Sequence, residues 1–354
     1  MHTQLAPTTA TPLNVADYET LARERLDRPT WDYFAEGSAD EVTLRANSAA
    51  FERLRLRPRV IADEGPVSTA TSALGAPIEL PVLVAPTAYH GLVHPDAECA
   101  TARGAGDAGT IMIVSLNSNR TLEDIAAAAT GPLWQQLYLT GDHAADEEIV
   151  RRAEHAGYAA LVLTVDRPVY GARERDLRNG FRLPDNLRSA NYGGTRDLRA
   201  KAWTSWAAVD WLLQTTKLPV GVKGILTSED ARIAVERGVA AVLVSNHGGR
   251  QLDGALAGIE ALPAVASAVE GRCEVFCDGG VRRGADVLKA LALGARAVLV
   301  GRPIVWGLAV EGAAGVTAVI RMLGAEFERD LTLCGRRRVA DLDRSLVTSI
   351  PELP

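Results

Sequence analysis

Short apolar runs recur from residue 81 onward, and stretches with helical periodicity separate them. The eight apolar runs are residues 81–86, 110–115, 133–138, 160–166, 219–224, 240–245, 274–278 and 297–301. Intervening helical patterns include residues 146–156, 228–237 and 284–293. A run that is apolar throughout is typical of a strand in a parallel sheet whose outer face helices cover. Eight such strands alternating with helices predict an α/β fold of the (β/α)8 TIM barrel type.

Other patterns flank and interrupt this repeat. Helical spacing at residues 18–26, 30–35 and 41–51 predicts a short helical N-terminal segment, and residues 317–333 form another helical stretch. Residues 171–204, after the fourth strand, lack clear periodicity and are too long for a plain connection, so we interpret them as a lid. The predicted divisions are a flexible tail (1–13), the helical segment and connection (14–80), the barrel (81–340) and a C-terminal tail (341–354).

Composition narrows the classes of function. The chain has 354 residues, a net charge of −6, and 47% hydrophobic and 23% charged residues. A negative net charge argues against general affinity for nucleic acid or for anionic membranes. We find no run of about 18 apolar residues, so no membrane span is expected. The polar N-terminus lacks the basic and apolar regions of a signal peptide.

The four cysteines indicate neither a metal site nor a set of disulfide bonds. Cys273 and Cys277 share a strand-like stretch and have no matching Cys/His pair elsewhere, so no metal site is expected. Four cysteines in a chain of this length are also too few for a disulfide scaffold, and we expect a cytoplasmic location.

Polar side chains gather where the predicted strands end, which is where barrel enzymes place their active sites. The most informative stretch runs from Ser245 to Asp253, with His247 and Arg250 separated by two glycines. Histidine exchanges protons near neutral pH, and arginine holds a carboxylate through paired hydrogen bonds. This pattern predicts a site that processes a carboxylic acid.

The last two strands suggest a phosphate site. Asp278-Gly-Gly-Val-Arg282 and Gly301-Arg302 combine glycine amides with arginines, as in the phosphate-binding corner of many barrels. The chain lacks a Gly-x-Gly-x-x-Gly fingerprint, which disfavours a nicotinamide dinucleotide. Lys223, at the end of the fifth strand, is open to two interpretations: a structural ion pair with Asp278, or a cation that stabilises an electron-rich ring.

Taken in order, these motifs resemble the FMN-dependent 2-hydroxy acid oxidases and dehydrogenases, which include glycolate oxidase, lactate oxidase and mandelate dehydrogenase. The resemblance spans about residues 14–340. It rests on the motifs at 136–138, 163–166, 222–224, 245–253, 278–284 and 301–303.

The resemblance implies a role for each matching residue. The implied catalytic residues are His247, Asp166, Tyr138, Arg250 and Lys223. The implied substrate site comprises Tyr33, Arg173, Arg250, Tyr138, Asn117 and Tyr89. The implied FMN contacts are Pro86, Thr87, Ala88, Ser115, Gln136, Thr164, Lys223, Ser245, Asp278, Gly280, Arg282, Gly301 and Arg302. His247 would be the base, Asp166 would stabilise its protonated form, and the arginines would grip the substrate carboxylate.

The implied reaction is oxidation of an (S)-2-hydroxy acid to the 2-oxo acid, with proton removal by His247 and hydride transfer to flavin N5. Ala88 resembles the oxidase members, which favours O2 as the acceptor and H2O2 as the product. Asn117 replaces a tryptophan of glycolate oxidase, so the pocket wall differs. Members of the family are commonly homotetramers.

Three alternatives stay open. The same half-reaction could serve a dehydrogenase with another acceptor and a mandelate-type aryl substrate. A prenyl diphosphate isomerase would need a second anion site and magnesium ligands. A non-catalytic flavin-binding relative is disfavoured by the intact set of charged rim residues.

Overall fold

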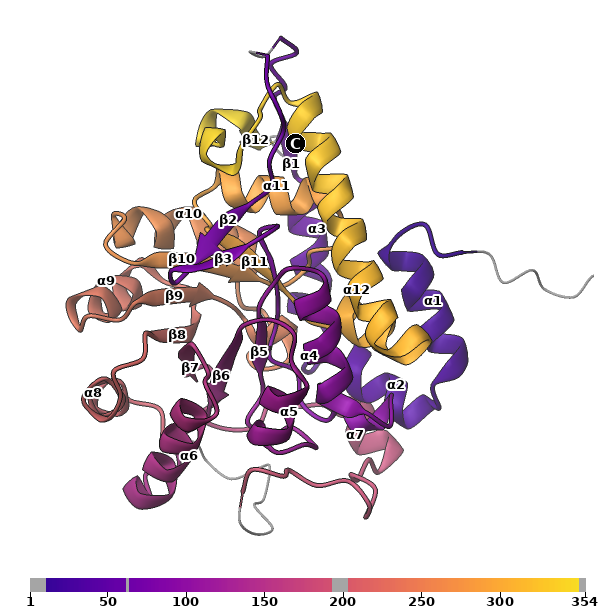
Figure 1. Cartoon of the computed structure of the whole chain (residues 1–354), viewed down its shortest axis with the longest axis vertical. Helices are drawn as coiled ribbons and strands as arrows, with labels where there is room; N and C mark the ends of the chain where they lie inside the picture. Colours follow the sequence, from indigo (N-terminus) through magenta and orange to yellow (C-terminus); the bar gives the residue numbers. More distant parts are fainter. Residues whose placement is uncertain (1–10, 62–63, 193–202, 350–354) are drawn as a thin grey trace, which may run out of the picture.

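The computed structural model describes residues 11–61, 64–192 and 203–349. Eight parallel strands close into a barrel in the order β10-β11-β4-β5-β6-β7-β8-β9 (Figure 1). The strands are β4 (Val82–Val84), β5 (Met112–Val114), β6 (Leu133–Leu137), β7 (Ala160–Thr164), β8 (Val220–Ile225), β9 (Ala241–Val244), β10 (Glu274–Asp278) and β11 (Ala297–Val300). Each coincides with one of the eight apolar runs, so the (β/α)8 prediction is confirmed.

Helices surround the barrel. Those that follow barrel strands are α4 (Ala97–Asp107), α5 (Leu122–Ala128), α6 (His143–His155), α7 (Glu174–Asn179), α8 (Trp206–Thr215), α9 (Ser228–Glu236), α10 (Gly258–Val269), α11 (Gly284–Ala292) and α12 (Arg302–Leu333). Short 3-10 turns, η1 (His90–Leu92) and η2 (His247–Gly249), lie in the loops after β4 and β9. The periodic stretches at 146–156, 228–237 and 284–293 correspond to α6, α9 and α11.

The N-terminal segment is helical as predicted, with α1 (Val15–Arg25), α2 (Arg28–Ala35) and α3 (Val42–Glu52). Side-chain caps fix two of these helices. Asn14 accepts backbone N–H groups at the start of α1, and Asp27 accepts that of Thr30 at the start of α2. The α1 helix packs along α12, and Figure 1 shows the two side by side.

Helix α12 begins earlier than the predicted 317–333 stretch and is interrupted at Glu311 and Gly312, whose backbone angles are not helical. By length and composition it is the one described helix apolar enough to cross a membrane, although no such run was expected from the sequence. However, 72% of the apolar window is buried inside the protein. The apolar residues of α12 therefore serve as core contacts with α1, α4 and α11.

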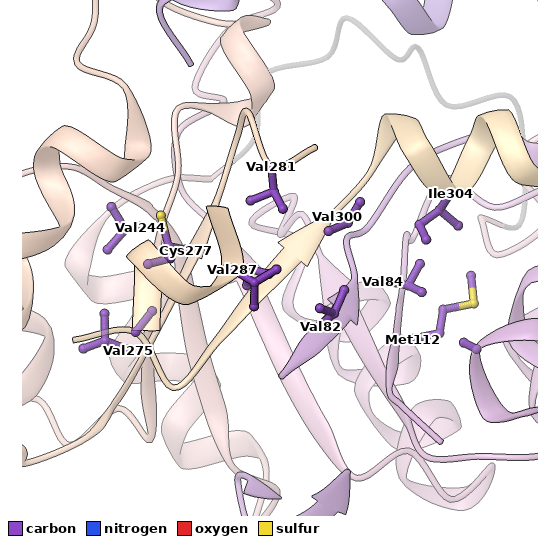
Figure 2. Close-up of a cluster of buried hydrophobic side chains, with 14 of the residues drawn as sticks. Val82, Val84, Met112, Val244, Val275, Cys277, Val281, Val287, Val300 and Ile304 are labelled. Atoms are coloured by element: carbon purple, nitrogen blue, oxygen red, sulfur yellow. The ribbon is translucent and has the colours of Figure 1, made fainter. Parts of the chain in front are cut away.

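Strand alternation divides the core into two layers, because successive side chains of a strand point to opposite faces. In β4, Val82 and Val84 belong to the outer cluster beneath the helices, while Leu83 belongs to the inner cluster. Figure 2 shows part of the outer cluster, where Val82 and Val84 lie near Val300. Within the barrel, Trp134 and Phe276 meet edge to face at 5.5 Å.

Four short strands outside the barrel were not predicted. The hairpin of β2 (Thr71–Ala73) and β3 (Ala76–Ile78) contributes Ala73 and Ile78 to the inner cluster. Strand β1 (Leu54–Leu56) pairs antiparallel with β12 (Val347–Ser349), which follows the 3-10 turns η3 (Val339–Asp341) and η4 (Arg344–Leu346). Residues 341–349, which the predicted divisions assign to the C-terminal tail, include η4 and β12, and β1 supplies the hydrogen-bonding partner of β12.

The predicted lid, residues 171–204, is described up to residue 192 and from residue 203. It contains one described helix, α7, which packs against α2. No periodic signal in the sequence predicts α7, since its six residues carry no buried side chain. The part of the lid prediction that concerns residues 193–202 lies outside the described residues.

Candidate active site

One cavity opens at the C-terminal ends of the barrel strands, with an empty volume of about 1160 Å³ that includes its open mouth. It brings together most of the residues predicted from the sequence. The predicted residues that line it are Tyr33, Pro86, Thr87, Ala88, Tyr89, Ser115, Asn117, Tyr138, Thr164, Arg173, Lys223, His247, Arg250, Asp278, Gly280, Arg282, Gly301 and Arg302. The remaining three, Gln136, Asp166 and Ser245, lie behind this wall and contact its members.

His247 is oriented by hydrogen bonds at three atoms. Its Nδ1 lies 2.7 Å from Asp166 Oδ1, its backbone N–H donates to Ser245 Oγ at 3.0 Å, and its Nε2 lies 3.4 Å from the Tyr138 hydroxyl. Because Asp166 accepts the proton on Nδ1, the lone pair of Nε2 faces the cavity. The backbone of His247 is left-handed, with φ of 60°.

Burial and nearby charges keep the His247 imidazole neutral, so that it can accept a proton. Burial lowers the pKa of His247 below its usual value, although the Asp166 carboxylate opposes this shift. Burial would raise the pKa of Asp166, but the nearby His247 and Lys223 outweigh it and lower the pKa. At neutral pH, Asp166 is therefore ionised and His247 is a neutral base. Asp166 Oδ2 has no hydrogen-bond partner among the described residues, so Asp166 can also stabilise a protonated imidazole.

Asp166 reaches His247 because the next strand approaches it closely. Gly224 follows Lys223 in β8 with φ of +112°, and a Cβ at this position would lie 2.5 Å from the Asp166 Cβ. Any other residue there would displace the carboxylate.

Lys223 forms the ion pair that the sequence left open, and it also lines the cavity. Its Nζ lies 2.9 Å from Asp278 Oδ2 and donates to Ser245 Oγ at 2.7 Å. Burial would lower the pKa of Lys223, but the carboxylates of Asp278 and Asp166 outweigh burial and raise it. The cavity floor therefore holds a permanent positive charge.

Two arginines of the cavity lining can hold a carboxylate. Arg250 Nη1 donates to the backbone oxygen of Glu36 at 3.1 Å, and its guanidinium lies 5.3 Å from the centre of the Tyr33 ring. Arg173 Nη1 donates to the Tyr170 hydroxyl at 2.6 Å. Arg173 Nε is buried without a partner among the described residues, which leaves a donor for a bound anion. Paired guanidinium donors of this kind match the two oxygens of a carboxylate.

The side wall is polar and aromatic. The Tyr89 hydroxyl lies 3.1 Å from Ser189 Oγ, and the Tyr89 backbone N–H donates to the Asn117 carbonyl at 3.3 Å. Tyr33 stacks on Phe181 at 4.8 Å. Tyr33 and Phe181 come from α2 and from the segment after α7, so this wall is assembled from outside the barrel.

Another part of the cavity lining combines glycines with buried arginines. Gly280 has φ of +87°, and a Cβ there would lie 2.0 Å from the Asn47 carbonyl of α3. Arg302 donates to three backbone carbonyls, those of Phe34, Gly248 and Glu36. Burial lowers the pKa of Arg302 to about 9, and it lowers that of Arg282 as well. An anion placed here would offset both desolvated charges.

A hydrogen-bond chain behind the wall connects the strand ends. Gln136 Nε2 donates to Thr164 Oγ1 at 3.0 Å, and Gln136 Oε1 accepts from the Leu116 backbone at 3.2 Å. Ser245 Oγ accepts from both Lys223 and His247. In this structure Gln136 and Ser245 position cavity residues, and their predicted direct contacts to a cofactor stay predictions.

Two cavity residues with polar side chains were missed by sequence reasoning. The Arg167 guanidinium lies 4.7 Å from the centre of the Tyr138 ring and 5.5 Å from that of Tyr170, and both Arg167 and Tyr170 line the cavity. Arg167 directly follows Asp166, just beyond the end of β7. Its position after a strand end could therefore have predicted that it lies at the cavity. Tyr170 had no comparable signal, because the loop after β7 shows no periodicity.

The arrangement matches one kind of chemistry. A neutral imidazole, fixed by the Asp166 carboxylate, shares one cavity with two guanidinium groups. A substrate held by its carboxylate would present an adjacent hydroxyl to the base. Positioning of this kind lowers the entropic cost of the reaction.

Comparisons with known proteins point to the same chemistry. Residues 22–349 match the family model described as FMN-dependent dehydrogenase. The chain is 44% identical to an L-lactate oxidase of Nostoc sp., over 96% of this chain and 98% of that protein. It is 45% identical to glycolate oxidase 1 of Zea mays, over 94% of each protein.

Solved structures agree. A mandelate oxidase with (S)-2-phenylpropionate superposes with a TM-score of 0.91 at 45% identity, covering 96% of this chain and 99% of that one. A mutant of mandelate oxidase with (S)-mandelic acid gives a TM-score of 0.92 at 44% identity, covering 97% of this chain and 100% of that one. The resemblance drawn from the sequence motifs is thus confirmed.

Proposed function

The chain belongs to the FMN-dependent dehydrogenase family, and on that premise we propose that it oxidises an (S)-2-hydroxy acid to the 2-oxo acid with O2 as the electron acceptor. FMN is its cofactor, and oxidation of 2-hydroxy acids is the reaction class of its relatives. The observation that carries the proposal is one cavity lined by the neutral base His247 together with Arg173 and Arg250.

The cavity residues fit FMN. Asp278 Oδ1 is buried and has no hydrogen-bond partner among the described residues, so it can accept from a ribityl hydroxyl. The glycines at 280 and 301 leave backbone amides accessible beside Arg282, which suits a phosphate. Lys223 would lie at the flavin ring, where a fixed cation favours the reduced and more negative form. Bound FMN supplies the acceptor for the two electrons that leave the substrate.

The protein's own residues perform the remaining steps. Arg173 and Arg250 hold the substrate carboxylate, and the Tyr138 hydroxyl donates to the substrate. This hydroxyl stays protonated well above neutral pH, since burial raises the already high pKa of a tyrosine. His247 Nε2 takes the hydroxyl proton as the α-carbon is oxidised. Asp166 then stabilises the imidazolium that forms, which lowers the barrier to proton removal.

The electron acceptor and the substrate side chain are finer parts of the proposal. The named relatives are oxidases. Ala88, the residue that resembles the oxidase members, lines the cavity. Both points support O2 as the electron acceptor. Tyr89, Asn117 and Arg167 make one side of the cavity polar. Asn117 stands where glycolate oxidase has the larger tryptophan, which supports a substrate with a side chain larger than that of glycolate, including an aryl group. Among the described residues, no group of three or more His, Cys, Asp or Glu side chains is placed to hold a metal ion.

We also propose a homotetramer in the cytoplasm. Support for assembly comes from three exposed apolar side chains, Val42, Leu252 and Leu256, at 49%, 74% and 55% exposure. They lie on adjoining segments, because the Thr43 hydroxyl donates to the carbonyls of Leu252 and Ala255. Light scattering of the purified protein, compared with Leu252→Glu, tests the tetramer. The four unpaired cysteines agree with a reducing compartment.

Anaerobic mixing of the purified flavoprotein with glycolate and both enantiomers of lactate and mandelate tests the reaction. We expect the (S)-acids to bleach the flavin absorbance, and admission of air to restore it with formation of H2O2. If no 2-hydroxy acid bleaches the flavin, the proposed reaction is wrong. If bleaching occurs but air does not reverse it, the enzyme is a dehydrogenase with another acceptor.

A further inference from the structure

Glu36 is a buried carboxylic acid that the reaction described above does not use. It follows α2 directly and is 0% exposed. Its backbone carbonyl accepts hydrogen bonds from Arg250 Nη1 at 3.1 Å and from Arg302 Nη2 at 2.8 Å. The main chain of Glu36 thereby fixes one of the two arginines that face the substrate.

The side chain of Glu36 fixes the segment that carries the other arginine. Glu36 Oε2 accepts the backbone N–H groups of Arg175 at 3.1 Å and Asp176 at 3.2 Å, in the first turn of α7. Arg173 is the N-cap residue of that helix and provides no side-chain cap, so Glu36 takes over this role. The carboxyl group thus holds the start of α7 in place.

Neighbouring residues reinforce the same connection. The backbone N–H of Ser38 donates to the carbonyl of Gly249 at 2.8 Å, next to Arg250, and that of Ala39 donates to the carbonyl of Ala172 at 2.7 Å, next to Arg173. Residues 36–39 therefore bridge the loop after β9 and the loop after β7 at points adjacent to both arginines. A shift of this bridge would change how the two arginines are spaced.

We infer that Glu36 is a positioning residue that sets the spacing of Arg173 and Arg250, and that it does so in its protonated form by sharing a proton with Asp176. This inference rests on the proposed function, because it concerns the groups that hold the substrate carboxylate.

The shared proton follows from the hydrogen-bond pattern. Asp176 is the neighbouring acid whose carboxyl group acts on that of Glu36, and the Asp176 backbone N–H donates to Glu36 Oε2 at 3.2 Å. Glu36 Oε1 and Asp176 Oδ1 are both buried, and neither has a donor among the described residues. If both neighbouring carboxyl groups were ionised, two buried acceptors would lack a donor, whereas one shared proton can satisfy both. Burial, with Asp176 as a further cause, raises the pKa of Glu36 to about 7.

The surrounding charges do not remove the need for this proton. The charged groups near the pair on adjacent elements are Asp32, Glu41, Arg175, Arg250 and Arg302. Arg175 is already engaged by Asp32 and Glu41, and Arg302 by three backbone carbonyls. Arg250 lowers the pKa of Glu36, but less than burial and Asp176 raise it.

The direction of the pH effect follows from the raised pKa. The protonated form of Glu36 is favoured in the folded protein, so its contact with Asp176 is present at low pH and is lost as pH rises through about 7. Above that pH the two carboxylates repel each other at the start of α7. Arg173 then shifts relative to Arg250, and affinity for the substrate carboxylate falls.

Glu36→Gln tests this in the holoenzyme, because glutamine keeps the shape and stays uncharged at every pH. We measure KM and kcat for the best (S)-2-hydroxy acid between pH 6 and 9, and the Kd of its 2-oxo acid product from the change in flavin absorbance. In the wild type we expect KM and Kd to rise roughly five- to tenfold between pH 6 and pH 9, while kcat changes less. A rise of this size corresponds to the loss of about one hydrogen bond. In Glu36→Gln both should stay at their low-pH values.

Three further variants serve as controls. Asp176→Asn removes the other partner of the pair and should flatten the pH dependence in the same way, which keeps the test available if one variant folds poorly. Glu36→Ala removes the carboxyl group altogether and should raise KM at every pH. Asp27→Ala removes the cap at the opposite end of α2 and should lower stability without changing KM.

The inference is overturned if Glu36→Gln and Asp176→Asn keep the wild-type rise in KM and Kd. It is also overturned if Asp27→Ala raises KM as much as Glu36→Ala does, since the effect would then reflect stability alone. Turnover by the wild type at pH 6 tests the proposed reaction separately, so a failure of that proposal is distinguishable from a failure of this one.

Discussion

Two sets of side chains meet at the cavity, and they are held in different ways. The strand-end set comprises Asp166, Lys223, Ser245, His247 and Asp278. Its members sit at or just beyond the ends of β7 to β10 and hydrogen-bond to one another. The wall set comprises Tyr33, Tyr89 and Tyr170. Its members come from α2 and from loops, and they are held by ring stacking and by contacts between segments.

This difference separates the residues that carry out the reaction from those that select the substrate. Neighbouring parallel strands fix the strand-end set to the barrel, so its geometry changes only if the barrel changes. The wall set depends on segments outside the barrel, which can vary without loss of the core. Substitutions in the strand-end set should therefore reduce the reaction for every substrate, while those in the wall set should change which substrate is preferred.

The largest effect is expected from His247→Gln in the strand-end set. Loss of the base should slow anaerobic flavin reduction by roughly 10⁴-fold or more for all 2-hydroxy acids, with FMN still bound. Stopped-flow absorbance measures this rate. His90 is a matched control, because it is also buried but does not line the cavity. If His90→Gln slows reduction equally, the effect is not specific to the base.

A smaller effect is expected from Lys223→Met. Loss of the fixed cation should lower the rate of flavin reduction about 10²- to 10³-fold. It also leaves Asp278 as a buried, unpaired carboxylate, which costs about 3–5 kcal/mol of unfolding free energy. Thermal and denaturant unfolding of Lys223→Met and of the double variant with Asp278→Asn separate the two effects. The double variant should regain stability but not rate.

The smallest effect is expected in the wall set, from Tyr89→Phe. The variant loses the contact with Ser189, which we expect to change the ratio of kcat/KM for mandelate and glycolate by roughly fivefold, equivalent to about 1 kcal/mol. Tyr158 is the matched control, since its buried hydroxyl donates to the Leu122 carbonyl outside the cavity. A similar loss for both substrates in Tyr89→Phe would contradict the division into two sets.

The same division explains what could be predicted from the sequence. The strand-end set was accessible because each strand is a continuous apolar run, and a barrel brings the residues after such runs to one rim. His247 and Lys223 could thus be assigned to one site from local patterns alone. The barrel itself followed from counting the runs.

The wall and the chain ends were harder to predict. Tyr170 and Arg167 lie in a loop without periodicity, and their place in the cavity depends on contacts with residues distant in sequence. Glu36 carried no signal, because its role depends on α7, a helix of six residues. The pairing of β1 with β12 was missed for a similar reason, since three-residue strands carry too little pattern to be recognised.

The β1–β12 pairing also has a consequence for synthesis on the ribosome. Leu54 pairs with Ser349, so residue 349 must leave the ribosome before β1 finds its partner. At about 5–20 residues per second, the intervening chain takes roughly 15–60 s to make. Barrel closure between β4 and β11 also waits for the last strand. Strand β1 and the edge of β4 that faces β11 therefore stay unpaired for much of translation, and we expect nascent chains of this protein to be chaperone clients.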